Sequence, residues 1–120
     1  MQDHRQQLGR RGEEIAAAFL IERGFHVLAK NWRCPAGEVD IIVERAGEVR
    51  FIEVKTRSNL KHGYPEESVT HTKRRHLARA VEYWLQSSPV TPQHYQIDVI
   101  AIMKRGDGQS PEIVWLEQVV

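Results

Sequence analysis

The sequence of 120 residues has one cysteine, Cys34, which excludes an internal disulfide and a cysteine-built zinc site. Its six histidines show no HxxxH or HExxH spacing, so a histidine-built zinc enzyme is not indicated. It has no GxSxG, no P-loop and no GxGxxG preceded by a strand. No hydrophobic run approaches a membrane span, and no signal-peptide core follows the polar start. We therefore expect a cytoplasmic protein without a membrane partner.

The charge balance also excludes little by itself. A formal net charge of +1 does not mark a nucleic-acid binder, and 41% hydrophobic residues are typical of an ordinary globular chain. The length predicts a single domain over residues 1–120. Basic residues are nevertheless clustered, and local patches matter more than totals for phosphate contact. Such runs also occur on plain solvated helix faces; here they include Arg10, Arg11, Arg57 and Lys73.

The stretch 37–57, GEVDIIVERAGEVRFIEVKTR, predicts a β-hairpin. Residues 39–43 and 49–55 are rich in β-branched and aromatic side chains, as strands are. Ala46 and Gly47 lie between them, and glycine suits a turn that needs a positive φ. The hairpin is the centre of the predicted fold.

A two-residue turn at Ala46-Gly47 sets the register of this hairpin. Asp40 then faces Glu53, and Glu38 faces Lys55, so these four side chains share one side of the sheet. The apolar residues between them point to the other side: Val39, Ile41, Ile52 and Val54. A bulge would break this register.

Two opposed carboxylates repel each other in a plain sheet, and a divalent cation would reverse that effect. Asp40 and Glu53 offer the hard oxygen ligands that Mg²⁺ or Mn²⁺ prefers, with Lys55 beside them. The alternative is an ordinary solvated strand end on which Lys55 pairs with Glu38. Large apolar residues on both faces, such as Ile42 and Phe51 on the acidic side, weigh against that alternative because they predict a sheet covered on both sides.

The rest of the chain predicts helices around a sheet. Residues 12–22 have helical apolar spacing, with Glu13 leaning toward the core and Glu14 outward, while the residues before Gly9 read as a frayed terminus or first turn. A strand is expected at 25–32, a polar loop at 58–67, and a helix from Thr70 or Thr72 to about residue 87. Further strands are expected at 95–103 and 112–116. The order α-β-β-β-α-β-β predicts an α/β fold with a central mixed sheet flanked by helices.

The D…ExK pattern of Asp40, Glu53 and Lys55 resembles the signature of the PD-(D/E)xK nucleases, whose core is αβββαβ and whose members include archaeal Holliday junction resolvases. Nearly the whole chain resembles the YraN family of uncharacterised bacterial proteins. Four segments in order carry this likeness: GRRGEEIAA at 9–17, NW…GEVDII at 31–42, FIEVKTR at 51–57 and SVTHTKRRHLARAVEYWL at 68–85. Val39 stands where the nuclease signature often has proline.

The resemblance implies a role for each matching residue. Asp40 and Glu53 would bind Mg²⁺ or Mn²⁺, and Lys55 would activate the attacking water and stabilise phosphate charge. Glu13 would be an additional catalytic acid. The implied contacts to nucleic acid, DNA rather than RNA, are Arg57, Lys73, Arg10 and Arg11. Dimerisation is open, because resolvase relatives pair to cut two strands.

Three functions are consistent with these residues. The first is a metal-dependent nuclease acting on DNA, including branched or repair intermediates. The second is a non-catalytic nucleic-acid-binding module on the same fold. The third is a structural or interaction protein with ordinary surface acids. Retention of both acids and the lysine favours the first, since fold alone does not determine chemistry.

Overall fold

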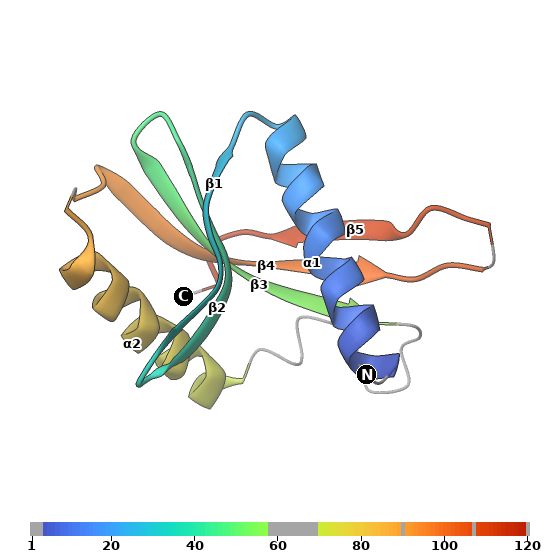
Figure 1. Cartoon of the computed structure of the whole chain (residues 1–120), viewed down its shortest axis with the longest axis horizontal. Coiled ribbons are helices and arrows are strands. Elements are labelled where there is room, and N and C mark those ends of the chain that lie inside the picture. Colours follow the sequence, from blue (N-terminus) through green and yellow to red (C-terminus); the bar gives the residue numbers. More distant parts are fainter. Residues whose placement is uncertain (1–3, 58–69, 90, 107, 120) are drawn as a thin grey trace.

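The computed structural model describes residues 4–57, 70–89, 91–106 and 108–119, with side chains from residue 9 onward. The described residues form two helices and five strands in the order αβββαββ (Figure 1). Their bounds are α1 His4–Glu22, β1 His26–Cys34, β2 Gly37–Arg45, β3 Glu48–Arg57, α2 His71–Ser87, β4 His94–Met103 and β5 Glu112–Leu116. This order confirms the predicted αβββαβ core.

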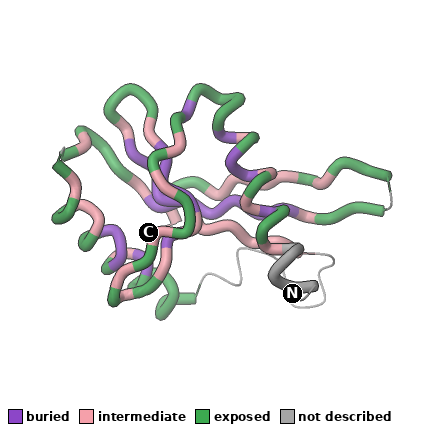
Figure 2. Tube along the Cα trace, in the orientation of Figure 1, coloured by how far each residue is buried: buried purple, intermediate pink, exposed green. Residues whose placement is uncertain are grey.

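The five strands make one mixed sheet in the order β1-β2-β3-β4-β5. Only β3 and β4 run parallel, because α2 connects them as a crossover; every other neighbouring pair is antiparallel. The two helices lie on opposite faces of the sheet, and the buried residues concentrate along the central strands (Figure 2). The expectation of a sheet covered on both faces is therefore confirmed.

Each helix has its own hydrophobic core. Under α1, buried side chains from the helix and four segments of the chain beside it form one cluster: Ala16, Ala17, Leu20, Phe25, Ile41, Val43, Ile52, Ile100 and Ile102. Under α2 lies a second cluster: Val39, Ile42, Val49, Phe51, Leu77, Ala80, Val81 and Ile97. The three tryptophans are partly buried: Trp32 and Trp84 pack against the second cluster and Trp115 against the first. The alternation of β3 and β4 between these clusters fixes which side chains face each helix.

The predicted hairpin forms with its predicted turn. Ile42 pairs with Phe51 and Arg45 with Glu48, as a two-residue connection requires. Both turn residues have positive φ, 51° at Ala46 and 83° at Gly47. A turn of this kind matches the twist of the flanking strands, although alanine is an unusual residue at its first position.

The second helix begins where its cap predicts. The Thr70 side chain accepts a hydrogen bond of 3.2 Å from the backbone N–H of Lys73. Leu77, Ala80 and Val81 are buried along one stripe, as their spacing indicates. Lys73 lies one turn earlier on the same stripe and points toward the end of β3, where it interacts with Lys55.

Helix α1 is longer than predicted. It starts at His4 rather than near Gly12, so the segment before Gly9 is helical and not a frayed terminus. Arginine and glutamine are good helix formers, and extending a formed helix is far easier than starting one. The predicted loop at 58–67 lies outside the described residues. Neither described helix is long and apolar enough to span a membrane.

A buried charge network links β3, β4, β5 and the residues that follow β5. The Asp98 carboxylate is fully buried and accepts hydrogen bonds from Arg50 (3.0 Å), Gln96 (2.8 Å), Trp115 (2.9 Å) and the backbone N–H of Gln118 (2.8 Å). Arg50 also donates to Glu48 and Glu117. Burial alone would lower the pKa of Arg50, but its hydrogen bonds to Glu117, Asp98 and Glu48 raise it above the ordinary value. Asp98 therefore has a structural role.

Replacing Asp98 with alanine tests this network. Asp98→Ala leaves the Arg50 guanidinium without its buried partner, and we expect a loss of roughly 3–5 kcal/mol in the free energy of unfolding. The matched control is Glu112→Ala, which breaks the half-exposed 3.8 Å pair with Arg105 and should change stability by less than about 1 kcal/mol. Urea denaturation of both variants measures the difference, and equal losses would contradict the assignment.

Candidate active site at the fork between β2 and β3

Strands β2 and β3 separate at Asp40. Their ladder runs from Arg45–Glu48 to Ile41–Ile52 and ends there. Beyond it, Asp40 Oδ2 accepts a hydrogen bond of 2.7 Å from the backbone N–H of Val54. The side chain thus replaces a ladder bond between the two backbones. The predicted cross-strand pairs of Asp40 with Glu53 and Glu38 with Lys55 are wrong, because the strands diverge before reaching them.

A kink shared by β1 and β2 lies where β2 leaves β3. The pairs Lys30–Ile41 and Trp32–Val39 place Asn31 beside Asp40, and Asn31 has a φ of 49°. Asparagine tolerates this left-handed conformation better than most residues. The alternation of side chains between the two faces of the sheet breaks on both strands at this point. Val39 and Ile42, three residues apart, both face α2, and so do their partners Trp32 and Ala29. The prediction that Val39 shares a face with Ile41 was therefore wrong.

The Asp40 carboxylate has an unusual protonation equilibrium. Burial raises its pKa most, and the negative charge of Glu53 raises it further, to about 7 from an ordinary 3.8. The Val54 N–H opposes the shift, while Glu13 and Glu38 add to it. Four acids therefore lie close enough to influence one another. Three of them, Glu13, Asp40 and Glu53, are predicted site residues.

Glu13 reaches this group from α1. Burial raises its pKa, a side-chain hydrogen bond with Asn31 lowers it, and the charges of Glu38 and Glu53 raise it again, so that the net direction is upward. Asn31 thus contributes to the site in two ways: its backbone lies beside Asp40, and its side chain forms a hydrogen bond with Glu13. Glu14 is exposed, as predicted from its position on the helix.

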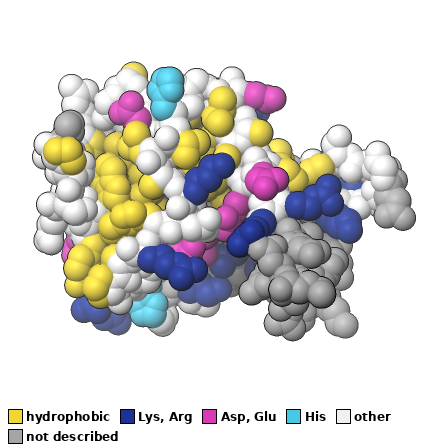
Figure 3. Space-filling model, viewed as in Figure 1, with side chains coloured by type: hydrophobic (Ala, Val, Ile, Leu, Met, Phe, Trp, Pro, Cys, Tyr) yellow, Lys and Arg dark blue, Asp and Glu magenta, His cyan; other side chains and the backbone are white. Residues whose placement is uncertain are grey.

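Cations gather beside the acids. Lys55 Nζ lies 2.9 Å from Glu53 Oε1, with both side chains mostly buried. The positive charge of Lys55 lowers the pKa of Lys73, burial lowers it further, and Arg57 adds a smaller effect in the same direction. Figure 3 shows Lys and Arg side chains around a small acidic group on this face. Lys55 does not pair with Glu38, which instead lies 3.8 Å from Arg33.

The predicted residues separate into those at the fork and one away from it. Six of them form one network of charge interactions at the fork: Asp40, Glu53, Lys55, Glu13, Lys73 and Arg57. The positive charge of Arg10 also lowers the pKa of Glu13. Arg11 instead lines a groove between α1 and the β4–β5 connection. Sequence reasoning missed Asn31, although an asparagine inside a predicted strand was a usable signal of a backbone irregularity.

The donor set fits a hydrated divalent cation better than a fully enclosed metal. Among the described residues, no group of three His, Cys, Asp or Glu side chains is arranged to hold a metal. Asp40 and Glu53 repel each other and are oxygen donors on the two arms of the fork. Mg²⁺ usually keeps several waters and takes one or two carboxylates, so these residues could hold Mg²⁺ or Mn²⁺.

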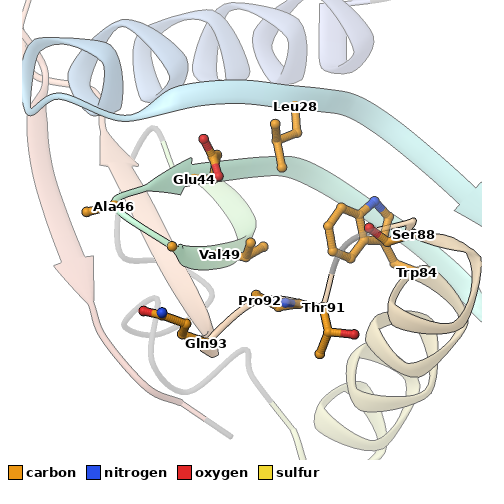
Figure 4. Close-up of a pocket in the computed structure, with 10 residues that line it drawn as sticks. Leu28, Glu44, Ala46, Val49, Trp84, Ser88, Thr91, Pro92 and Gln93 are labelled. Carbon is orange, nitrogen blue, oxygen red and sulfur yellow. The ribbon is translucent and has the colours of Figure 1, made fainter.

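A groove of about 730 Å³ lies away from these charges, between the β2–β3 turn and the end of α2 (Figure 4). Leu28, Val49, Trp84 and Pro92 supply apolar walls, and Glu44 is the one charged residue among the described residues that line it. A phosphate would meet no cation there. The wider groove is therefore a poor candidate for the chemistry that the fork residues indicate.

Two substitutions at Asn31 test the kink. Asn31→Gly keeps the positive φ accessible and loses only the hydrogen bond with Glu13, so we expect a loss in unfolding free energy of about 1 kcal/mol. Asn31→Val should cost at least about 1–2 kcal/mol, because a β-branched residue is strained in the left-handed region. In an ordinary strand valine would be the more stable choice, so a valine variant that resists urea better than the glycine variant would refute the kink.

The raised pKa of Asp40 predicts how stability changes with pH. The folded state holds this proton up to about pH 7, whereas the unfolded state releases it near 3.8. Stability should therefore fall as pH rises through this window and then level off. Asp40→Asn keeps an acceptor for the Val54 N–H and removes the titration, so it should exceed wild type by roughly 1–4 kcal/mol at pH 8 and match it near pH 4. Urea titrations in EDTA at both pH values measure this, and parallel pH profiles would disprove it.

Comparison with known proteins gives a consistent family. The family model described as "Uncharacterised protein family UPF0102" matches residues 12–102, which include the fork. A "UPF0102 protein" of Caldicellulosiruptor saccharolyticus is 44% identical over 82% of this chain and 84% of its own. Those of Clavibacter michiganensis and Desulfitobacterium hafniense are 44% and 40% identical over 91% and 99% of this chain and 93% and 100% of theirs. This chain therefore belongs to the UPF0102 family.

Proposed function

We propose that this protein is a divalent-metal-dependent nuclease that hydrolyses phosphodiester bonds of nucleic acid, DNA in the first instance, at the β2–β3 fork. One observation carries the proposal: a group of acidic side chains lies directly beside a group of basic side chains. Acidic neighbours that raise the pKa of Asp40 adjoin cations that lower the pKa of Lys73. A divalent cation relieves the first repulsion and a phosphate relieves the second. The resemblance to the PD-(D/E)xK signature points to the same chemistry.

Asp40 and Glu53 would hold Mg²⁺ or Mn²⁺, which supplies charge to polarise the phosphate and to lower the pKa of a water. Asp40 is fixed by the Val54 N–H, so its free oxygen is already oriented. Its raised pKa means that cation binding would compete with a proton near neutral pH. Activity at subsaturating metal should therefore increase from pH 6 to pH 8.

Lys55 and Lys73 would contact the phosphate. Lys55 is held against Glu53, so it would lie beside a water that this carboxylate orients. Arg57 is a third donor: its Nε is buried and is the one such side-chain atom without a hydrogen-bond partner in the described part of the chain. An anion at this place would satisfy that N–H. Glu13 would accept hydrogen bonds from the water shell of the metal.

A cleavage assay with matched lysine variants tests the proposal. Wild type, Lys55→Ala and Lys30→Ala would meet end-labelled single-stranded, duplex, flap and four-way-junction DNA and a structured RNA, with Mg²⁺ or Mn²⁺. Lys30 is an exposed lysine on β1, so its variant controls for loss of one charge. We expect cutting by wild type and Lys30→Ala, and at least about 100-fold slower cutting by Lys55→Ala.

Thermal unfolding with Mn²⁺ separates this function from its alternatives. A metal held at the fork should raise the Tm of wild type and leave that of Asp40→Asn unchanged. Equal cutting by Lys55→Ala and wild type would mean a contaminant and would rule out the proposed site. Retained nucleic-acid binding with no cutting would favour the non-catalytic module instead.

A further inference from the structure

A second basic surface lies on the other side of α1 from the acids. It is a groove of about 390 Å³ between α1 and the connection from β4 to β5. Arg11, Lys104 and Arg105 supply its charges, and Thr56 and Gln109 supply polar groups. Neither Lys104 nor Arg105 is part of the D…ExK pattern, because both lie in the turn region after β4. Figure 3 shows that basic side chains continue onto the base of the hairpin formed by β4 and β5.

The charge of the groove is unbalanced. Among the lining residues that the structure describes there is no acid, and all three cations are exposed. In the described part of the chain, Arg105 forms an ion pair with Glu112 at 3.8 Å, with more than half of each side chain exposed. A pair of this kind contributes little and leaves the arginine available. The groove is therefore suited to an extended polyanion.

The base of the groove is ordered by backbone contacts. The N–H of Lys104 donates to the carbonyl of Arg57 (2.8 Å), and the N–H of Gln109 donates to Gly106 (3.1 Å). The first bond ties the start of the β4–β5 connection to the end of β3, and the second lies within the connection itself. Side chains on an ordered backbone lose less conformational freedom when they bind a ligand.

A close helix–strand contact sets the groove next to the fork. At Gly12, α1 lies so near β3 that a Cβ would be 2.0 Å from Thr56 Oγ1. The next residue of the helix is Glu13, and the residue before Thr56 is Lys55. Adjacent strand residues point to opposite faces, so Thr56 faces the groove and Lys55 faces the cations at the fork. One residue on each element separates the two surfaces.

From this juxtaposition we infer that the groove binds the sugar–phosphate backbone of the strand that is cut at the fork, through Arg11, Lys104 and Arg105. The inference rests on the proposed function for the identity of the strand. A nucleic-acid strand carries one charge per 3.4 Å of helix axis, so phosphates flanking the scissile one fall within reach of neighbouring cations. These contacts would hold the strand in register without reading its sequence.

Salt-dependent binding tests the groove separately from catalysis. The double variant Lys104→Gln/Arg105→Gln removes the two cations of the β4–β5 connection. Its control, Arg23→Gln/Arg45→Gln, makes the same change in net charge at the other end of α1. Anisotropy titrations in EDTA would use short labelled single-stranded and duplex DNA over a range of NaCl concentrations.

We expect the slope of log K against log salt to fall by about 1.4 on single strands or about 1.8 on duplex for the groove variant, with affinity at about 0.1 M salt roughly 25- to 60-fold weaker. The control should keep the wild-type slope. Circular dichroism and Tm must show that both variants fold.

The outcomes distinguish the two proposals. If wild type cuts DNA and the groove variant keeps the wild-type slope, the groove inference fails and the nuclease stands. If wild type binds without cutting and the groove variant alone loses slope, the nuclease fails and the groove stands. Equal losses in the groove variant and its control would reduce the effect to net charge and overturn the inference.

Discussion

The fold depends at its centre on a hydrogen bond from a backbone amide to a side chain. Where β2 leaves β3, the Asp40 carboxylate takes the N–H of Val54 that a neighbouring strand would otherwise accept. Asn31 makes this geometry accessible because its left-handed backbone lets β1 and β2 bend together. The consequence is an opening in the sheet that is lined by carboxylates and covered from one side by α1. A flat hairpin would have placed the same residues on a closed surface.

The electrostatics of the opening follow from its position between two helices. α1 contributes Glu13 and the strands contribute Asp40 and Glu53, so negative charge accumulates where burial already disfavours it. α2 brings Lys73 against Lys55, so positive charge accumulates beside it. Folding stability would be better served by interspersing the two signs. Groups whose pKa values are shifted, such as Asp40 and Lys73 here, tend to cluster at functional sites.

Much of this arrangement could be predicted from residue patterns. The apolar stripe of α2, its Thr70 cap and the Ala46-Gly47 turn are local signals, and each determines a local structure. The D…ExK pattern selected Asp40, Glu53 and Lys55, which do lie together, although the cross-strand register used to place them ends at Ile41. The register beyond Ile41 could not be predicted, because it depends on a bend of two strands at Asn31 whose cost is met by tertiary contacts. Lys104 and Arg105 were missed because only the folded hairpin brings them next to α1.

The buried charge network around Asp98 has a consequence for how the sequences of related chains can vary. Trp115 and Gln118, which satisfy that buried carboxylate, and Glu117, which holds Arg50, all follow β4 and lie beyond the part of the chain matched by the family model. The segment after residue 102 thus supplies the partners of buried charged groups and is not a dispensable extension. A relative that keeps an acid at this position but ends differently needs another donor to cover it, so this acid and the C-terminal segment should vary together.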